Sequence, residues 1–221
     1  MNKIIDPGES PAEIRKYYDE ITKAYQIAFA GPPWFEVSKC TDDLRRCEGG
    51  FSALDVGDFC TKCQQCTQEP AYLEADLVSK FDEISATRPS RWYLEFCEEN
   101  VALASLAWRA GSEQIADEKY DNKPEIKAWL ANQLPRDRDV IWLDEVFANK
   151  SIRPDRNLNN FTAMISLFMR ELNLPLLAYR TINPQMVSGA ERFGSNARIF
   201  AREKDVPDRR DFVIITNGRQ S

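Results

Sequence analysis

Five of the six cysteines lie close together in a stretch from Lys39 to Thr67, and their spacing suits metal chelation. Three of them form the run C-T-K-C-Q-Q-C, in which two thiolates a short turn apart can hold one edge of a tetrahedral zinc site. The other two are one heptad apart, so a helix between them would place both thiolates on one face. We therefore predict a structural zinc ion, Zn2+, in an insert of residues 39–67, with five candidate ligands: Cys40, Cys47, Cys60, Cys63 and Cys66.

Four ligands fill a tetrahedral shell, and we favour Cys40, Cys47, Cys60 and Cys63, with Cys66 as the alternate for Cys60. Disulfides and redox-active thiols are the two alternative interpretations of the same cluster. The lack of an export signal argues against disulfides, and clustered free thiols would invite oxidation. A shell filled with thiolates leaves no open position for water, which favours a structural metal over a catalytic one.

A second chemical signal is the stretch from Val140 to Phe161, together with the amphipathic segment that follows it to Asn173. It begins as an apolar, β-prone run, crosses a polar loop, and continues as TAMISLFMRELN with apolar residues at helical spacing. The first turn of a helix presents unpaired N–H groups and the positive end of the helix dipole. The order strand, loop, helix therefore predicts a phosphate site where this helix begins.

The elements around these two signals alternate between helix and strand. Apolar residues at helical spacing predict helices at residues 11–30, 69–86, 112–134 in two pieces, 162–173 and 183–193. Apolar β-prone runs predict strands at residues 92–97, 101–109, 140–147, 174–179, 197–203 and 212–217. Antiparallel strands followed by alternating strands and helices predict an α+β (mixed) fold, which we interpret as a single domain of residues 1–221.

The first two strands are predicted to form a hairpin that turns at Glu99 and Asn100. Cys97, the one cysteine outside the cluster, falls within the first of these strands. We expect its side chain to be a small buried apolar group, because free cysteine is among the most buried residue types.

Composition limits the classes of function. The net charge is −6, from 35 acidic and 29 basic residues, which argues against nucleic-acid or anionic-membrane binding and favours a basic or amine-bearing partner. No apolar run approaches the ~18 residues that span a bilayer, and the start MNKIIDPGES lacks the apolar core of a signal peptide, so we predict a cytoplasmic protein. The sequence contains no histidine, which excludes mechanisms based on an imidazole base. The oligomeric state cannot be predicted.

The order of elements and three local segments resemble the GNAT superfamily of N-acyltransferases, which use acetyl-CoA. The segments are AFAGPPW at residues 28–34, the strand, loop and helix at residues 146–167, and NPQMVSGAERFG at residues 183–194. The likeness covers most of the chain outside the cysteine insert. It implies a mixed central sheet flanked by helices, acetyl-CoA as the co-substrate, and a small-molecule or peptide amine as the acceptor.

The resemblance implies that acetyl-CoA contacts the end of the strand, the pyrophosphate loop and the next helix. Asn157, Asn160 and Thr162 occupy the signature positions of that loop, in which both family glycines are absent. The hydroxyl of Thr162 can cap the helix, and Arg153 and Arg156 can form charge-assisted contacts with phosphates. The expected cofactor contacts are Val146, Phe147, Ala148, Arg153, Arg156, Asn157, Leu158, Asn159, Asn160, Phe161, Thr162 and Asn183.

The same resemblance indicates the catalytic groups. Some family members use acids on this strand to deprotonate the amine, and Asp144 and Glu145 stand at the corresponding place. Strand alternation puts them on opposite faces, and we favour Glu145 as the base; apolar neighbours are expected to raise either carboxyl pKa. The family tyrosine that protonates the departing thiolate corresponds to Ala190, which leaves Ser188 as the only hydroxyl of that helix and the second catalytic candidate. Asn183 matches the family's asparagine that holds the cofactor arm or orders water.

The sequence therefore predicts an acetyl-CoA-dependent N-acetyltransferase that transfers an acetyl group to a primary amine by direct attack. The alternative is a GNAT-like scaffold without catalysis, which binds acyl-CoA or a protein partner. Release of free CoA with an amine acceptor distinguishes the two.

Overall fold

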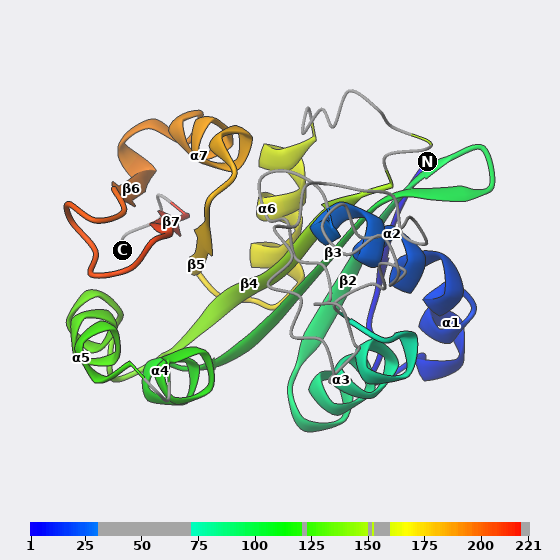
Figure 1. The fold of residues 1–221 in the computed structure, drawn as a ribbon, viewed down its shortest axis with the longest axis horizontal. Coiled ribbons are helices and arrows are strands. Elements are labelled where there is room, and N and C mark those ends of the chain that lie inside the picture. Colours follow the sequence, from blue (N-terminus) through cyan, green and yellow to red (C-terminus); the bar gives the residue numbers. More distant parts are fainter. Residues whose placement is uncertain (31–71, 121–122, 150–151, 153–159, 218–221) are drawn as a thin grey trace, which may run out of the picture.

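The computed structural model describes residues 1–30, 72–120, 123–149, 152 and 160–217. Within these residues, one seven-stranded mixed sheet forms the centre of the molecule (Figure 1). Neighbouring strands are antiparallel except β4 and β5, which run parallel. In spatial order the strands are β1 (Asn2–Ile5), β2 (Ser90–Cys97), β3 (Asn100–Gly111), β4 (Asp139–Ala148), β5 (Leu176–Thr181), β7 (Asp211–Thr216) and β6 (Ala197–Phe200).

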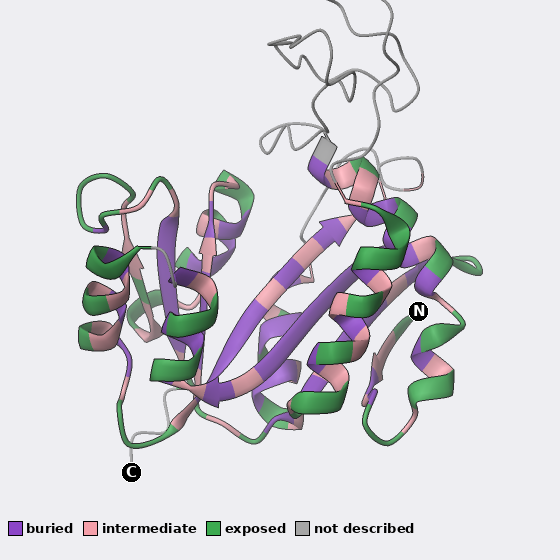
Figure 2. Cartoon of the chain, turned by 60° about the horizontal axis from the view of Figure 1, so that its bottom comes forward, coloured by how far each residue is buried: buried purple, intermediate pink, exposed green. Residues whose placement is uncertain are grey.

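Helices cover both faces of this sheet. One face carries α1 (Pro11–Arg15), α2 (Tyr18–Ala30), α3 (Glu74–Thr87), α4 (Ser112–Tyr120) and α5 (Pro124–Gln133), which pack on the larger apolar cluster. The other face carries α6 (Phe161–Glu171) and α7 (Pro184–Glu191), which pack on the second cluster, and the 3-10 turn η1 (Gly194–Asn196) follows α7. The strands of the sheet are largely buried, and the exposed residues lie on the outward sides of the helices (Figure 2). The predicted mixed α+β fold is confirmed.

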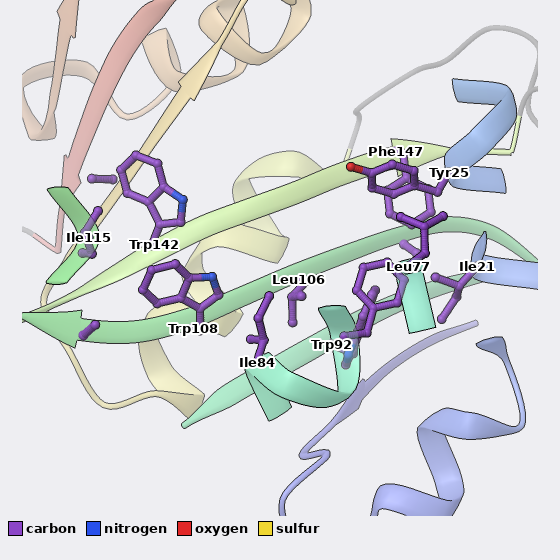
Figure 3. Close-up of a cluster of buried hydrophobic side chains, with 14 of the residues drawn as sticks. Ile21, Tyr25, Leu77, Ile84, Trp92, Leu106, Trp108, Ile115, Trp142 and Phe147 are labelled. Atoms are coloured by element: carbon purple, nitrogen blue, oxygen red, sulfur yellow. The ribbon is translucent and has the colours of Figure 1, made fainter. Parts of the chain in front are cut away.

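Three tryptophans on successive strands anchor the larger cluster. Trp92, Trp108 and Trp142 are all fully buried, and Trp108 pairs directly with Trp142 across β3 and β4. Phe81 of α3 meets the ring of Trp92 edge-on, with 4.9 Å between the ring centroids. Figure 3 shows the side chains of α3 reaching the same cluster. This packing fixes α3 over the sheet, and with it Lys80, the residue next to Phe81.

The first thirty residues differ from the prediction in two ways. Strand β1, which was not predicted, pairs with β2 from Asn2 opposite Glu95 to Ile5 opposite Trp92. Its four residues, of which the first two are polar, are too few to show a clear alternating pattern. The strand forms because it pairs with β2. The predicted helix at residues 11–30 is interrupted at Lys16, and the chain forms two shorter helices instead.

The hairpin of β2 and β3 turns one residue earlier than predicted. Cys97 pairs with Asn100, so Glu98 and Glu99 form the turn, and Glu98 has a φ of 56°. The prediction of a buried Cys97 is wrong: its side chain is exposed. Cys97 is the last paired residue before the turn, where the strand extends past the helices that cover the sheet. Its position, and not its residue type, therefore decides its burial.

The second half of the chain follows the predicted order closely. Pro124 opens the second of the two helices between β3 and β4, and β6 and β7 form the expected terminal antiparallel pair. Strand β7 lies between β5 and β6, so it also pairs antiparallel with β5. The predicted insert at residues 39–67 lies outside the described residues, and the single-domain interpretation stays a prediction.

Candidate active site

Strands β4 and β5 are neighbours for only a short distance. Their parallel ladder has two paired positions, Ile141 with Leu177 and Trp142 with Ala178. Beyond these positions the strands separate (Figure 1), and a cavity of about 200 Å³ lies beside the carboxyl-terminal half of β4. The carboxyl ends of parallel strands in open sheets are a usual place for ligand binding.

A bulge in β4 brings two carboxylates to this cavity. Leu106 pairs with Glu145 and Ala107 pairs with Leu143, so Asp144 has no opposite residue on β3. The extra residue shifts the alternation, and Asp144 and Glu145 both project toward α3, where Lys80 lies within ion-pair distance of each. The prediction that they face opposite sides of the sheet is therefore wrong.

The carboxylate of Glu145 is buried and has two partners from different helices. The phenol of Tyr25 on α2 donates a hydrogen bond to Oε1 at 3.1 Å, and the ammonium of Lys80 on α3 contacts the same oxygen at 2.5 Å. Glu145 is 8% exposed, so the carboxylate is largely removed from water. The backbone of Glu145 is held as well, because Ser105 on β3, which pairs with Val146, donates its hydroxyl to the carbonyl of Glu145 at 2.8 Å.

The carboxylate of Asp144 is enclosed by cations and indole groups. Lys119 on α4 forms an ion pair with Oδ1, and Lys80 lies 3.9 Å from Oδ2. The indole N–H of Trp142 donates to Oδ1 at 3.2 Å. This environment orients Asp144 firmly and leaves it little freedom to approach a substrate.

The two neighbouring carboxylates have pKa values shifted in opposite directions. Burial would raise the pKa of Asp144, but the ammonium groups of Lys119 and Lys80 outweigh it and hold the pKa below its usual range. Burial raises the pKa of Glu145; Lys80 opposes this only in part, and the charge of Asp144 adds to it. The expected increase is thus correct for Glu145 and wrong for Asp144. Two carboxyls with separated pKa values can divide structural and proton-transfer roles.

The wall of the cavity is strongly charged. The aromatic rings of Tyr25, Phe29 and Tyr72 line one part of it. The side chains that carry charge come from α3, α4, β4 and β5 and from just before β7: Lys80, Lys119, Asp144, Glu145, Arg180 and Arg210. A small polar molecule would meet cations and carboxylates together here.

Apart from Asn183, the expected cofactor contacts that fall within the described residues lie at the end of β4 and the start of α6. Val146 lines the cavity, whereas the Phe147 ring packs on the Tyr25 ring at 5.2 Å between centroids. Ala148 is half-buried at the last position of β4. The ring of Phe161 is buried against Tyr179, so only its backbone N–H can serve a ligand.

The N-terminus of α6 is formed without a side-chain cap. Asn160 is the N-cap residue, with φ −92° and ψ 8°, and its side chain makes no capping hydrogen bond. Its amide instead donates to Oε2 of Glu95 on β2 at 3.3 Å. Thr162 lies inside the first turn, so the expectation that it caps the helix is wrong. The first-turn N–H groups have no acceptor within the helix and remain suited to an anion.

Two further predicted site residues, Asn183 and Ser188, belong to helix α7. Asn183 is its N-cap and accepts a hydrogen bond from the backbone N–H of Gln185 at 2.9 Å. Ser188 is exposed on α7 and is not among the residues that line the cavity. Ala190, at the family tyrosine position, is fully buried. The structure thus brings Glu145 to the cavity but does not bring Ser188 to it.

Replacement of Gly189 by alanine is expected to disturb the contact between α7 and α6. A Cβ at this position would lie 2.6 Å from Cδ1 of Phe161, so the ring at the start of α6 would have to move. Overpacking of this kind costs about 1–3 kcal/mol, measurable by urea denaturation. Gly111→Ala is the control, because a Cβ there would meet no atom of the described residues within 4 Å. Equal stability of the two variants would contradict this packing.

The remaining predicted site residues lie outside the described part of the chain. They are Arg153, Arg156, Asn157, Leu158 and Asn159 of the loop, and the cysteine ligands Cys40, Cys47, Cys60, Cys63 and Cys66. Among the residues that are described, no group of three or more His, Cys, Asp or Glu side chains could hold a metal ion. The zinc site stays a prediction.

Several site residues were missed from the sequence. Lys80 and Tyr25 lie 65 and 120 positions from Glu145, each within the apolar pattern of a helix. Lys119 and Arg180 likewise carry no local motif. The pattern of the sequence shows where these helices and strands run, but not which side chains converge across them.

No family model matches the chain, and no curated protein matches it. Similar solved structures include the Drosophila melanogaster polyamine N-acetyltransferase that forms N-acetylagmatine, with 10% identity, 97% of this chain and 98% of that chain covered, and a TM-score of 0.48. A mosquito arylalkylamine N-acetyltransferase like 5b has 8% identity, 98% and 100% coverage, and a TM-score of 0.47.

A third similar structure is an N-acyl amino acid synthase from uncultured soil microbes. It has 13% identity, covers 64% of this chain and 75% of that chain, and has a TM-score of 0.41. Among the described helices, none is both long and apolar enough to cross a membrane.

Proposed function

We propose that this protein is an acyltransferase that moves an acetyl group from acetyl-CoA to a primary amine. The observation that carries the proposal is the buried carboxylate of Glu145 at the point where β4 leaves β5. Its pKa is raised, it lines a cavity of about 200 Å³, and the strand that holds it leads toward the uncapped start of α6. The resemblance of the sequence to GNAT acyltransferases agrees with this assignment.

The described residues suit a bound acyl-CoA in two ways. The first-turn N–H groups of α6 and the helix dipole favour a phosphate group at Asn160 and Phe161. The gap opens beyond Trp142 and Ala178, and α6 is the next helix after β4 in the described chain. An extended pantetheine arm could run between the separated strands with its thioester beside the bulge. When bound, acetyl-CoA supplies the acetyl thioester.

Glu145 would act as the general base. An ammonium group cannot attack a carbonyl carbon, so the acceptor amine must first lose a proton, which Oε2 or Oε1 of Glu145 can accept. The amine nitrogen then bonds to the carbonyl carbon, the carbon–sulfur bond breaks, and the departing thiolate takes up a proton. Ser188, the donor expected from the sequence, does not line the cavity, so we assign this proton to a solvent water.

Two measurements test the proposal. Isothermal titration with acetyl-CoA should show saturable binding and protection against thermal unfolding. A panel of primary amines and peptides should release free CoA in the presence of the protein. Binding without any CoA release would favour the alternative of an acyl-CoA-binding scaffold, and the absence of both would overturn the proposal.

Replacement of Glu95 by glutamine is expected to strengthen the binding of acetyl-CoA. Glu95 contacts Asn160, so its negative charge stands beside the helix start where a phosphate would bind. Removal of one like charge at that distance should lower the Kd about two- to tenfold at low salt, and less in high salt. Titration of both proteins at two ionic strengths measures this. Glu125→Gln, on the exposed start of α5, should leave the Kd unchanged; a Glu95→Gln protein that binds no better would contradict the phosphate site at α6.

A further inference from the structure

Arg180 occupies a position on β5 that corresponds to Asp144 on β4. The last paired residues of the two parallel strands are Ala178 and Trp142, and Arg180 and Asp144 each lie two residues beyond them. Both side chains line the cavity. The guanidinium lies 4.9 Å from the centre of the Tyr120 ring on α4, which places it on the same face of the sheet as the carboxylates. Arg180 thus faces the gap from the side opposite β4.

The charges around the cavity do not cancel. Lys80 and Lys119 are paired with Glu145 and Asp144, so the two lysines and the two carboxylates neutralise one another. Arg180 and Arg210 also line this wall, and within the described residues no carboxylate lies at ion-pair distance from Arg180. The wall is therefore positive in a protein whose net charge is −6. Such a local reversal of sign attracts an anionic group.

The geometry of the cation suits a carboxylate in particular. A guanidinium presents several N–H donors in a fixed plane and binds a carboxylate through two parallel hydrogen bonds. The aromatic ring of Tyr120 supports the guanidinium from its face and holds its plane. A cavity of about 200 Å³ is smaller than the usual site for a drug-sized ligand, which limits the acceptor to a small molecule.

We propose that the acceptor is an amino acid, whose carboxylate binds Arg180 while its amine faces Glu145. This inference rests on the proposed acyltransferase function and names its substrate class. The reaction product is then an N-acetyl amino acid, with the amine proton passing to Glu145 and the thiolate leaving as CoA. Arg180 selects the substrate through its charge and takes no part in proton transfer.

Matched pairs of ligands that differ only in the carboxylate test the proposal. Phenylalanine and phenethylamine form one pair, leucine and isoamylamine a second, and ornithine and putrescine a third. Isothermal titration measures binding of each ligand without acetyl-CoA, and release of free CoA measures KM and kcat with it. The wild-type protein should bind and acetylate the amino acid of at least one pair in preference to its amine.

Arg180→Ala should weaken the binding of that amino acid, and raise its KM, by about 10- to 100-fold, the usual effect of a lost charge-assisted hydrogen bond. The loss should be at least tenfold smaller for the carboxylate-free amine of the same pair, so the ratio of the two losses measures the contact with the carboxylate. Arg180→Lys keeps the charge but lacks the planar pair of donors, so its Kd for the amino acid should lie between those of the wild type and Arg180→Ala. Arg198→Ala is the matched control, because Arg198 is an exposed strand arginine that also stacks on an aromatic ring, Phe200, away from the cavity.

Each outcome decides the inference. A wild-type preference for amines over amino acids, an equal loss of both ligand classes in Arg180→Ala, or no binding of any amino acid would overturn it. If amino acids bind through Arg180 but no acceptor releases CoA, the binding site stands and the proposed transferase function falls. Thermal unfolding of each variant shows whether a loss comes from the site or from the fold.

Discussion

Replacement of Glu145 by glutamine is expected to lower kcat/KM for acetyl transfer by about 10²- to 10⁴-fold, the usual contribution of a general base. Glutamine keeps the size and one oxygen of the side chain but cannot accept the amine proton. The Tyr25 phenol can still donate to that oxygen, so the fold should persist. The initial rate of CoA release, with acetyl-CoA saturating, measures the effect. Titration with acetyl-CoA should give an unchanged Kd.

The pH dependence of the rate provides an independent test of Glu145. A base acts only when it is deprotonated, so kcat/KM should rise with pH as Glu145 loses its proton. Because burial raises the pKa of this group, that rise should occur above the ordinary range of a glutamate, which is about 4.3. In Glu145→Gln the acidic limb should disappear. An unchanged rate and an unchanged acidic limb in the variant would show that solvent, rather than Glu145, deprotonates the amine.

The matched control for Glu145 is another single carboxylate. Glu113 lies exposed in the first turn of α4, and Glu113→Gln removes the same charge without touching the cavity. Its kcat/KM should remain within about twofold of the wild-type value, since surface substitutions away from special features have small effects. A comparable loss in both variants would point to net charge instead of to the base.

Replacement of Lys119 by methionine is expected to destabilise the fold by on the order of 3 kcal/mol at pH 7. The ammonium of Lys119 is the buried partner of Asp144, whose side chain is only 5% exposed. Methionine fills a similar volume but leaves the Asp144 carboxylate with the Trp142 indole N–H and with one distant cation among the described residues, Lys80 at 3.9 Å. Removal of one member of a buried ion pair leaves a poorly compensated charge, and this penalty exceeds the net worth of the pair. Urea denaturation measures the loss.

This loss of stability should depend on pH with a defined sign. In the wild-type protein the folded pKa of Asp144 lies below its ordinary value, so the pair contributes stability above about pH 4 that is lost as the pH falls through the folded pKa. Without Lys119 the buried carboxyl prefers its proton, and its folded pKa rises. The two proteins should therefore differ most near pH 7 and least below about pH 4. A difference that stays constant between those values would assign the loss to packing.

Lys127→Met provides the control for a lysine that does not face the buried carboxylates. Lys127 on α5 pairs with Asp117, and both side chains are well exposed to solvent. Exposed ion pairs contribute less than about 1 kcal/mol, and salt screens them. A loss for Lys127→Met as large as that for Lys119→Met would mean that burial of the Asp144 pair is not the cause.

Helices and strands could be predicted from the sequence where their pattern lies in a few neighbouring residues. The apolar residues of α6 recur at helical spacing, and Pro124 opens α5, so both helices could be predicted from the positions of a few residues. Strand β1 could not, because four residues carry no periodicity that stands out from the neighbouring chain. Cys97 was assigned to the correct strand, but its burial was predicted wrongly. The turn was predicted one residue too late, and the actual turn makes Cys97 the last paired residue of the hairpin.

The sequence by itself determined that a strand carrying Asp144 and Glu145 is followed by an amphipathic helix, because the pattern of each element lies within a dozen residues. Only the tertiary structure decided what the two acids do. The pairing of β4 with β3 contains a bulge at Asp144, and this bulge turns both carboxylates to one face of the sheet. Lys80, Lys119 and Arg180 reach the same cavity from three different elements. Charges that converge across such distances in sequence leave no local pattern, and they set the opposite pKa shifts on which the proposed chemistry depends.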